Sequence, residues 1–464
     1  MSRRSVVGVC SGLGGLGLLR RPAATTWIVA SASVAMLLTA CTGDTSTPEP
    51  APTEGVTVTG TPLYLVDGNL GSRPIERLPA GAMTGVPGTV PGAPLDEEFR
   101  AELEAIDPDV SGAAYSYAPE TFDAITVTAL AAQAARTDAP NLVAAQMSEV
   151  SQAGKECRSF AECDLLLRQG EDINYEGVSG SVDFTDTGDI AAATIGVFTY
   201  DDQNLVPGYT SEASETTPQF VEAQSSESSE SPSATSEPVT GPADGQLVFA
   251  ALLAQSGELK SFQTPIDAAA ELAIEQVNEA GGVLGREVSL TTGDGPDDTV
   301  VASAETLLAD GADVVISATS SSATLAVLDQ FVGNAVLVVG SSQTAPELSE
   351  FDDAGLYFRT APSDEMQGKV LADRIVSDGA TQVAILARDD AYGRGLAEAV
   401  RRRLQDEGTE IATSVFFDPE QRRFDAKVAK VASRDPDAIV LVSFDEAAKI
   451  IKELERQGIA PSSS

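Results

Sequence analysis

The chain has 464 residues, enough for two lobes or domains, and carries a formal net charge of −41. The charge is best interpreted as a solvated acidic surface. It makes binding to nucleic-acid phosphates or anionic headgroups unfavourable. Histidine is absent from the sequence. This excludes a Ser-His-Asp triad, a Cys-His pair and a histidine zinc site, so a hydrolase is the weaker hypothesis.

Residues 1–40 are predicted to be the signal peptide of a lipoprotein. Arg20–Arg21 precede an apolar run, Trp27–Leu38, which is shorter than the about 20 residues of a transmembrane helix. The run ends in Leu38–Cys41, which looks like a bacterial lipobox. Cys41 is therefore predicted to carry the lipid. A plain signal peptide with an incidental cysteine, or an uncleaved anchor, is the alternative.

Two low-complexity segments divide the remaining chain. Residues 41–55 are rich in Thr, Pro and Glu and are predicted to form a flexible tether. Residues 209–245 are rich in Ser, Glu and Pro and poor in large apolar residues, so burial cannot offset their ordering entropy and a disordered linker is predicted. The structured parts are then residues 56–208, the upstream part, and residues 246–464, the downstream part.

The downstream part alternates strand-like and helix-like segments. A helix is predicted to start at Thr264–Asp267, where a cap, a proline and an acid follow one another, and to end at Gly281–Gly282. Predicted strands are Leu247–Leu253, Val288–Thr291, Val314–Ser317, Val336–Val339, Val383–Ala387, Ile411–Phe416 and Ala438–Val442. Strands that alternate with helices predict an α/β fold with parallel sheets and helices on both faces.

The upstream part begins with another apolar strand, Leu63–Val66. It continues with predicted helices at Thr121–Ala135 and Asn141–Ser148 and a predicted strand pair, Gly180–Phe184 with Ala192–Tyr200, around the turn Thr185–Asp189. Cys157 and Cys163 lie close together in this part. In an oxidising compartment this spacing favours a small-loop disulfide over a metal site. The sequence has neither a phosphate loop nor calcium-loop spacing, so no metal and no cofactor is predicted.

Hydroxyl-rich turns follow two neighbouring predicted strands. Ser320–Ser322 come after Val314–Ser317 and open a helix, and Ser341–Pro346 come after the next strand. Free N–H groups and hydroxyls at such strand-to-helix turns can hold an anion, and a carboxylate would suit them. Ordinary helix capping is the alternative for each turn taken alone.

An acid and three aromatic residues are further candidates. Asp67 ends a predicted strand and could hold a ligand ammonium, although such a residue is more often a turn residue capping Asn69 or Leu70. Tyr392 also follows a predicted strand. Tyr392, Phe262 and Tyr117 are predicted either to line a cleft or simply to pack.

Stretches of both parts resemble the substrate-binding proteins of branched-chain-amino-acid-type ABC importers. In the downstream part these are VFAALLAQSGEL, AIEQVNEAGGVLGREVSL, SATSSSATLA, SSQTAPEL, YFRTAPSD and ILARDDAYGRGLA. In the upstream part they are YLVDGN, GTVPGA, YSYAPETFDAI, CRSFAEC and YEGVSGSVDFTDTGD. The resemblance implies a two-lobed type I periplasmic-binding-protein fold, in which each lobe is a parallel sheet flanked by helices. Three crossovers at the hinge join the lobes, and the ligand lies in the cleft.

The resemblance also implies roles for the residues of the two turns. Ser320, with its neighbour Ser321, is similar to the family serine that binds the ligand carboxylate. Ser342 and Thr344 resemble the positions in the next turn that hold the carboxylate and the amino group. Gln343 stands where relatives have a small residue, so the identity of the ligand is open.

The remaining implied site residues come from both parts. Asp67 occupies the place of the family acid that pairs with the ammonium, and Tyr392 matches a cleft tyrosine. Phe262 and Tyr117 match aromatic neighbours of the ligand side chain. A further cleft position falls on Phe444 or Asp445.

The order of the two parts departs from the family. The downstream part resembles the beginning of a family member and the upstream part resembles its end, with the seam between a helix ending near Gly458 and a strand starting near Leu63. A circular permutation is physically reasonable, because a linker of this length spans roughly 30 Å and the cut lies in a predicted surface loop. A rearranged or mis-assembled gene and a fragment of a tandem array are the alternatives.

Together these features predict a lipid-anchored solute-binding protein at the extracytoplasmic face of a bacterial membrane. The expected ligand is an amino acid of the branched-chain type or a small amide-like solute, and the expected partners are ABC permease subunits. The protein is expected to be a monomer and not an enzyme, and to bind the membrane through its lipid and not to bind nucleic acid. A ligand-sensing or scaffold lipoprotein with the same fold is the alternative.

Overall fold

A computed structural model describes residues 60–92, 95–110, 115–210, 243–256, 259–296 and 298–459. The predicted signal peptide, Cys41 and the tether lie outside these residues, as do residues 211–242 of the predicted linker. No helix within the described ranges has both the length and the apolar character needed to cross a membrane.

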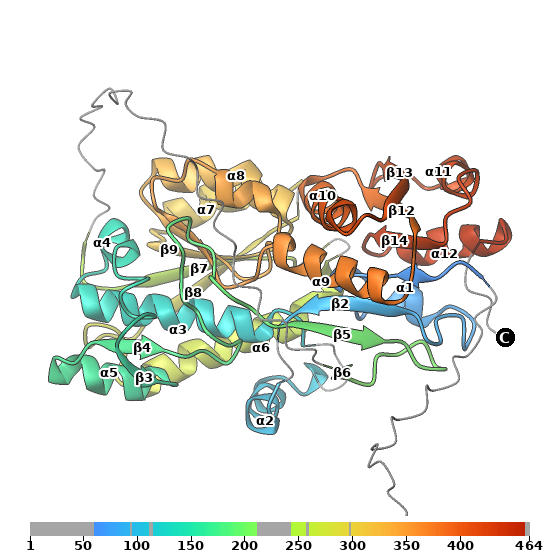
Figure 1. The fold of residues 1–464 in the computed structure, drawn as a ribbon. Coiled ribbons are helices and arrows are strands. Elements are labelled where there is room, and N and C mark those ends of the chain that lie inside the picture. The colour runs from blue at the N-terminus through green and yellow to red at the C-terminus, as the bar shows by residue number, and fades with distance from the viewer. Residues whose placement is uncertain are drawn as a thin grey trace, which may run out of the picture. The chain divides into compact units, whose positions relative to one another are not determined.

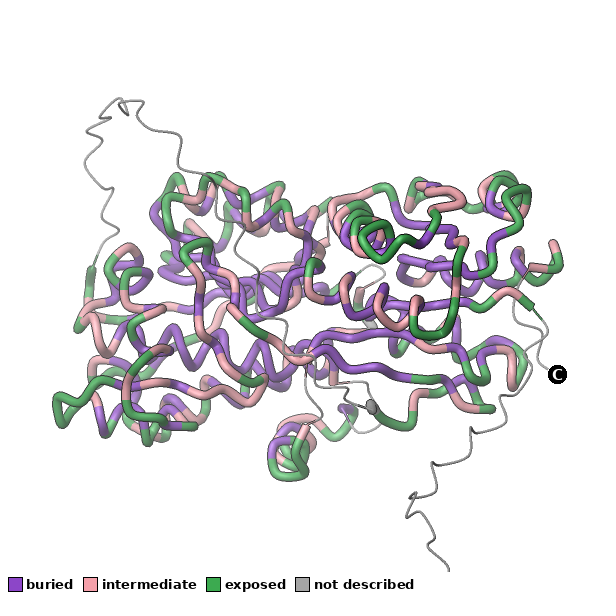
Figure 2. The backbone as a smooth tube through the Cα atoms, in the orientation of Figure 1, coloured by how far each residue is buried: buried purple, intermediate pink, exposed green. Residues whose placement is uncertain are grey.

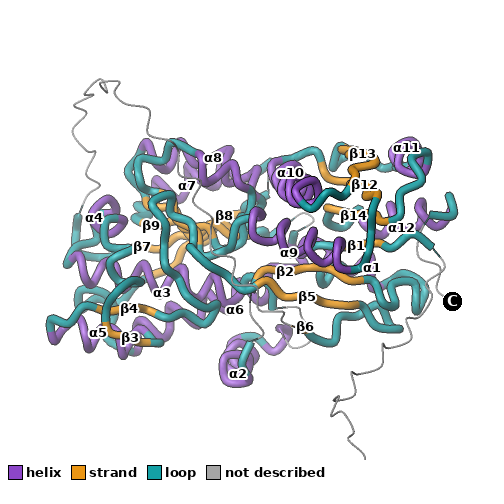
Figure 3. The backbone as a smooth tube through the Cα atoms, viewed as in Figure 1, coloured by secondary structure: helices purple, strands orange, loops and turns teal. Residues whose placement is uncertain are grey.

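Two parallel sheets organise the described chain, as Figures 1 and 3 show. The five-stranded sheet runs in the order β11-β10-β9-β7-β8 and defines the first lobe. Its strands are β7 (Val248–Leu253), β8 (Ser289–Asp294), β9 (Val314–Ala318), β10 (Leu337–Gly340) and β11 (Tyr357–Arg359). The four-stranded sheet runs in the order β1-β14-β12-β13 and defines the second lobe. Its strands are β1 (Leu63–Tyr64), β12 (Gln382–Arg388), β13 (Glu410–Phe417) and β14 (Ala438–Val442).

The other strands of the described residues form two smaller sheets. An antiparallel sheet contains β2 (Pro87–Pro91), β5 (Ile195–Thr199) and β6 (Tyr209–Thr210). A parallel pair is formed by β3 (Lys155–Cys157) and β4 (Ile173–Tyr175). β6 includes the first two residues of the predicted disordered linker, so the linker prediction was wrong for these two.

Helices lie between most of the strands in chain order, as the alternating pattern predicted. In the upstream part they are α1 (Arg73–Glu76), α2 (Glu97–Ile106), α3 (Ala118–Ala135), α4 (Pro140–Ala144) and α5 (Phe160–Gln169). In the downstream part they are α6 (Lys260–Glu279), α7 (Val300–Ala309), α8 (Ser321–Gly333), α9 (Asp364–Ser377), α10 (Ala391–Asp406), α11 (Asp425–Ala432) and α12 (Ala447–Arg456). Short 3-10 turns are η1 (Asp67–Asn69), η2 (Pro108–Val110) and η3 (Pro346–Glu350).

Continuous apolar runs form the central strands of both sheets. Every residue of β9 and β14 is buried, and Figure 2 shows the strands as buried segments beneath partly exposed helices. A parallel strand that is covered on both faces needs apolar residues at successive positions and not at alternate ones. This explains why both strands were predicted within one residue of their bounds.

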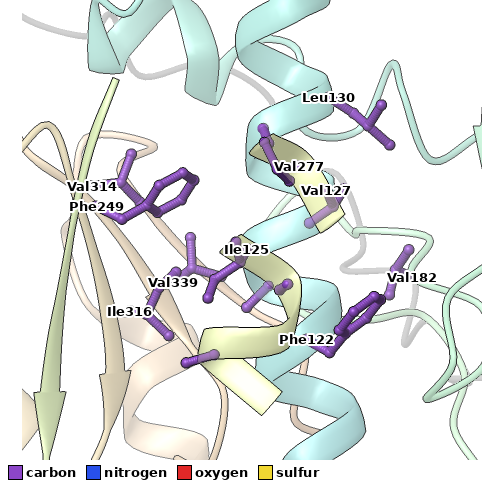
Figure 4. Packing of buried hydrophobic residues seen from close by; sticks show 14 of the residues in the cluster. Phe122, Ile125, Val127, Leu130, Val182, Phe249, Val277, Val314, Ile316 and Val339 are labelled. Atoms are coloured by element: carbon purple, nitrogen blue, oxygen red, sulfur yellow. The ribbon is translucent and has the colours of Figure 1, made fainter. Parts of the chain in front are cut away.

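The upstream and downstream parts share the same sheets and cores. β1 of the upstream part pairs in parallel with β14 of the downstream part, with Leu63 opposite Ile439. In the first lobe, α3 packs against α6, and Figure 4 shows Ile125 of α3 facing Val339 and Ile316 of the sheet. Each lobe therefore contains segments that are far apart in sequence.

Of the predicted strand pair, Ala192–Tyr200 is confirmed by β5, but the strand at Gly180–Phe184 and the pairing were wrong. Residues 180–184 form only isolated bridges, Glu176 with Ser181 and Phe184 with Ile190. β5 pairs instead with β2, a strand that was not predicted. β2 begins and ends with a proline, Pro87 and Pro91. Proline has no N–H to donate to a neighbouring strand, so the sequence pattern argued against a strand here.

The predicted start of the helix at Thr264 was also wrong. α6 begins four residues earlier at Lys260 and contains Pro265. Its last helical residue is Glu279, just before Gly281–Gly282, as predicted. The earlier start places Phe262 and Ile266 at i and i+4, on one face of the helix.

A disulfide joins Cys157 to Cys163, with the two Cα atoms 5.4 Å apart, as the cysteine spacing predicted. It fastens β3 to α5, and both cysteines are buried.

We expect the double variant C157A/C163A to lose about 2 kcal/mol of unfolding free energy, because a short closed loop removes little entropy from the unfolded chain. Urea unfolding of this variant, compared with the oxidised and reduced protein, checks the value. Equal stability of oxidised protein and variant would contradict it.

Candidate ligand-binding site

A cavity lies where the carboxyl ends of strands from both sheets converge, the usual position of ligands in parallel α/β folds. All eight residues that the sequence predicted for ligand binding line it: Asp67, Tyr117, Phe262, Ser320, Ser321, Ser342, Thr344 and Tyr392. The other lining residues are Gly68, Leu259, Gln263, Ile266, Ala318, Thr319 and Phe444. The structure thus brings the predicted residues together, and their roles in binding stay a prediction.

One wall of the cavity is the N-terminus of α8. Ser320 is the N-cap, and its Oγ accepts a hydrogen bond from the Ala323 N–H at 3.0 Å. Ser321 Oγ accepts from the Ala345 N–H at 3.3 Å and so ties this turn to the next one. The first amides of a helix have no partner within the helix and carry partial positive charge. Capping and anion binding are therefore compatible at this turn, because the cap leaves other amides for a ligand.

The neighbouring turn after β10 is held by the carbonyl oxygen of Thr319. Ser342 Oγ donates to this oxygen at 3.2 Å, and Gln343 Nε2 donates to it at 2.8 Å. Gln343 is fully buried and does not line the cavity. Its side chain therefore connects the two turns and does not face the cavity. The sequence had left open whether this residue changes the identity of the ligand.

Asp67 is the acid of the opposite wall. It is only 4% exposed. Its Oδ2 accepts from the Tyr117 hydroxyl at 2.6 Å, and its Oδ1 accepts from the Tyr392 hydroxyl at 2.8 Å and from Gln367 Nε2 at 2.8 Å. These donors hold the carboxylate in one orientation at the edge of the cavity.

Asn69, and not Asp67, provides the side-chain bond of the turn after β1. Its Oδ1 accepts from the Val66 N–H at 3.1 Å, and its Nδ2 donates to the Ser443 carbonyl at 2.6 Å. The turn is thereby anchored to the end of β14. The carboxylate of Asp67 is left to face the cavity.

Burial sets the protonation of the groups around Asp67. It raises the pKa of Tyr117 and of Tyr392 well above the usual value, and the nearby charge of Asp67 raises each further. Both hydroxyls therefore remain donors. Burial, followed by the charge of Asp67, also holds the pKa of Asp364 well above its usual range, which favours the neutral acid there.

An aromatic stack closes another side of the cavity. The rings of Tyr392 and Phe444 lie parallel, with centroids 5.1 Å apart and an interplanar angle of 4°. The Arg388 guanidinium lies 4.1 Å from the centroid of the Phe444 ring. Asp445 accepts from the Ser72 hydroxyl at 3.1 Å and does not line the cavity. The further cleft position that the sequence left open is therefore Phe444.

Sequence reasoning missed several residues of the site. Leu259, Gln263 and Ile266 accompany Phe262 at the start of α6, and a correct helix start would have indicated Ile266 by its i+4 spacing. Gln367 and Asp364, at the start of α9, approach Asp67 from 300 residues away in sequence. No local pattern signals such a contact.

The cavity combines opposite polar walls with an apolar side. Its volume is about 50 Å³, and since one water needs on the order of 10–15 Å³, it has room for only a small solute. No group of metal-ligating side chains occurs among the described residues. The arrangement can hold a small molecule that carries a cation near one end and an anion near the other.

Removing the Tyr117 hydroxyl tests how firmly Asp67 is held. We expect Tyr117→Phe to lower the unfolding free energy by about 1.5–3 kcal/mol, because a hydrogen bond to a buried charged group is lost. The control is Tyr115→Phe, which removes a hydroxyl bonded to Glu104 at 2.8 Å on a half-exposed side chain. Urea unfolding measures both variants. Equal losses of unfolding free energy in the two variants would show that the hydrogen bond to Asp67 contributes no more than the one to Glu104.

Comparisons with known proteins agree with this geometry. Residues 246–463 match the family described as "Periplasmic binding protein", and residues 56–203 match "Receptor family ligand binding region". Each part of the chain is thus similar to a family of ligand-binding proteins, and the fold is that of the type I periplasmic binding proteins. The two parallel α/β lobes are those that the resemblance implied.

Similar curated proteins are named as amino-acid-binding proteins. The Leu/Ile/Val-binding protein homolog 1 of Brucella suis is 28% identical over 204 residues, which are 43% of this chain and 54% of that protein. The leucine-, isoleucine-, valine-, threonine-, and alanine-binding protein of Pseudomonas aeruginosa is 32% identical over 197 residues, 42% of this chain and 48% of that protein. The chain thus spans about half the length of the curated relatives it matches.

A solved structure is also similar. The branched-chain amino acid transporter substrate binding protein LivJ from Streptococcus pneumoniae, in complex with isoleucine, is 24% identical. The match covers 46% of this chain and 62% of that chain, with a TM-score of 0.41.

Proposed function

We propose that this protein is the solute receptor of an ABC importer and binds a free amino acid of the branched-chain type, or a small amide-like solute, between its lobes. It acts as a binding protein and not as an enzyme, and as a monomer. A lipid on Cys41 holds it at the extracytoplasmic face of the membrane, where ABC permease subunits are its partners.

The observation that carries the proposal is the pair of opposite walls in one cavity. Asp67, held by two tyrosine hydroxyls, supplies a negative charge for an ammonium group. The N-terminus of α8 at Ser320 supplies backbone N–H donors for a carboxylate, and Ser342 and Thr344 lie in the cavity wall. The apolar side formed by Phe262 and its neighbours suits an aliphatic side chain.

Contacts between the lobes support a closure mechanism. Tyr117 of the first lobe bonds to Asp67 of the second, and the Ala391 N–H at the start of α10 donates to Ser322 Oγ at 3.2 Å. A solute that touches both lobes favours the closed state over the open one, and the closed state is the form that docks on the permease.

Isothermal titration tests the proposal with leucine, isoleucine and valine, a panel of other amino acids and small amides. We expect binding of at least one aliphatic L-amino acid and much weaker binding of its decarboxylated or N-acetylated analogue, because each analogue lacks one of the two charges. Absence of heat and of any thermal shift across the panel would overturn the proposal.

The order of the chain is a separate part of the proposal. A circular permutation accounts for two family matches in reversed order, and it is supported by the pairing of β1 with β14 and the packing of α3 on α6. We expect a peptide of the native protein that spans residues 209–245 to join the upstream part to the downstream part. A reordered chain, 246–459 followed by 60–210, is expected to fold and to give the same titration. A native peptide that joins the segment near Gly458 directly to the segment near Leu63 would contradict permutation.

A further inference from the structure

A second cavity, of about 220 Å³, lies among the segments that pass from one lobe to the other. Gly92 follows β2, residues 192–194 precede β5, and Thr360 and Pro362 follow β11, and all of them line it. The chain crosses between the lobes at these three places. The cavity shares no lining residue with the first one.

Glu120, in the first turn of α3, is the titratable residue of this second cavity. It is 2% exposed, and its Oε2 has no hydrogen-bond partner. The lining contains no lysine and no arginine. A buried carboxylate without a counter-charge is unfavourable, so the site is incomplete as the protein alone forms it.

The walls around Glu120 are preformed and rich in oxygen atoms. Asp123, one turn further along α3, accepts from the Val178 N–H at 3.0 Å, the Ser179 N–H at 2.8 Å and the Tyr175 hydroxyl at 2.7 Å. This fixes the loop that carries the lining residues Ser179 and Ser181.

Thr360 fixes the opposite side, because its hydroxyl donates to the Glu120 carbonyl at 2.7 Å. The lining of the cavity therefore contains one acidic residue, Glu120, together with the hydroxyl-bearing residues Ser179, Ser181, Thr194 and Thr360.

We propose that this hinge cavity is a binding site for a small monovalent cation such as Na⁺ or K⁺, with Glu120 as its charged ligand. Carboxylate, hydroxyl and carbonyl oxygens are the donors that hard cations take. A single charge on the ion balances the single unpaired carboxylate, whereas a divalent ion would add uncompensated charge to a buried site. An ion bound there contacts all three lobe connections at once.

A proton competes with a cation at Glu120. Burial raises the pKa of Glu120 to about 8, and the charge of Asp123 adds to the effect. A cation must therefore compete with a proton at this carboxyl. The test is run at pH 9, where the carboxyl is ionised.

The experiment compares thermal unfolding midpoints of the full chain in sodium, potassium and choline chloride at equal ionic strength. We expect sodium or potassium to raise the midpoint saturably over choline, by roughly 2 °C at saturation. Glu120→Gln is expected to abolish the difference. Glu171→Gln, a change at an exposed glutamate after α5, is expected to keep it.

A direct measurement covers the case in which Glu120→Gln fails to fold. Equilibrium dialysis of the wild-type protein with radioactive sodium is expected to give one bound ion per chain, displaced by potassium and not by choline. Equal midpoints in all three salts, retention of the cation effect in Glu120→Gln, or no bound sodium would each overturn the proposal.

Discussion

Asp67→Asn is expected to weaken the binding of leucine, taken as the probe, by about 100-fold or more. The substitution keeps the shape of the side chain and removes the negative charge opposite the ligand ammonium. Loss of one partner of a buried, hydrogen-bonded charge pair costs about 2–5 kcal/mol of binding free energy. Isothermal titration or tyrosine fluorescence measures the dissociation constant.

The control for this variant is Asp445→Asn. Asp445 lies at the end of β14, next to the cavity residue Phe444, but it bonds to Ser72 and does not line the cavity. We expect its leucine affinity to stay within about threefold of wild type, since its charge is outside the site. Urea unfolding verifies that both variants fold. Similar losses in the two variants, or wild-type affinity in Asp67→Asn, would show that Asp67 does not pair with the ligand.

The N-acetylated amino acid distinguishes a charge effect from a packing effect. It has no ammonium group, so its weak binding is expected to be similar in wild type and in Asp67→Asn. A double comparison of two proteins and two ligands then isolates the pair energy. A loss of affinity that is the same for both ligands would assign the effect to altered packing of Tyr117 and Tyr392.

Local sequence patterns predicted those parts of the fold and site whose structure is determined by residues close together in sequence. β9 and β14 are continuous apolar runs, and hydroxyl residues follow β9 and β10 at the point where strand gives way to helix. Because the ends of parallel strands meet at one edge, such turns predicted a shared cavity. The position of Asp67 after β1 follows from the same rule.

Long-range contacts were not predictable in this way. Gln367 reaches Asp67 across 300 residues of sequence, and its own helix shows no sign of that contact. The pairing of β2 with β5 depends on Gly88, where an added Cβ would lie 2.3 Å from the Phe198 ring. The absence of a side chain at that position permits the close approach, but an isolated glycine in a strand is ambiguous in sequence.

Arg359 shows how tertiary structure ties the two separated parts of the chain together. Its side chain is fully buried and forms a salt bridge with Asp189 of the upstream part. Its other nitrogens donate to the Ala345 carbonyl at 3.0 Å, the Gln343 carbonyl at 3.3 Å and the Ser349 hydroxyl at 2.7 Å. One guanidinium therefore holds both the upstream turn at 185–189 and the loop that carries Ser342 and Thr344.

Arg359→Met is expected to lower the unfolding free energy by about 3–5 kcal/mol, because it leaves a mostly buried carboxylate and two buried carbonyls without their donor. The control, Arg158→Met, removes an arginine whose partner Glu156 is also exposed, and no measurable loss is expected. Urea unfolding followed by circular dichroism measures both.

The double variant Arg359→Met/Asp189→Leu separates the pair from the rest of the network. Arg359→Met is also expected to lower leucine affinity, because the loop at Gln343–Ala345 loses its support. Removing the stranded carboxylate is expected to recover part of the lost stability and none of the lost affinity. Stability and affinity would then respond differently to the second change. If both recovered together, the effect of Arg359 on the cavity would come only from its charge pair and not from the loop that it holds.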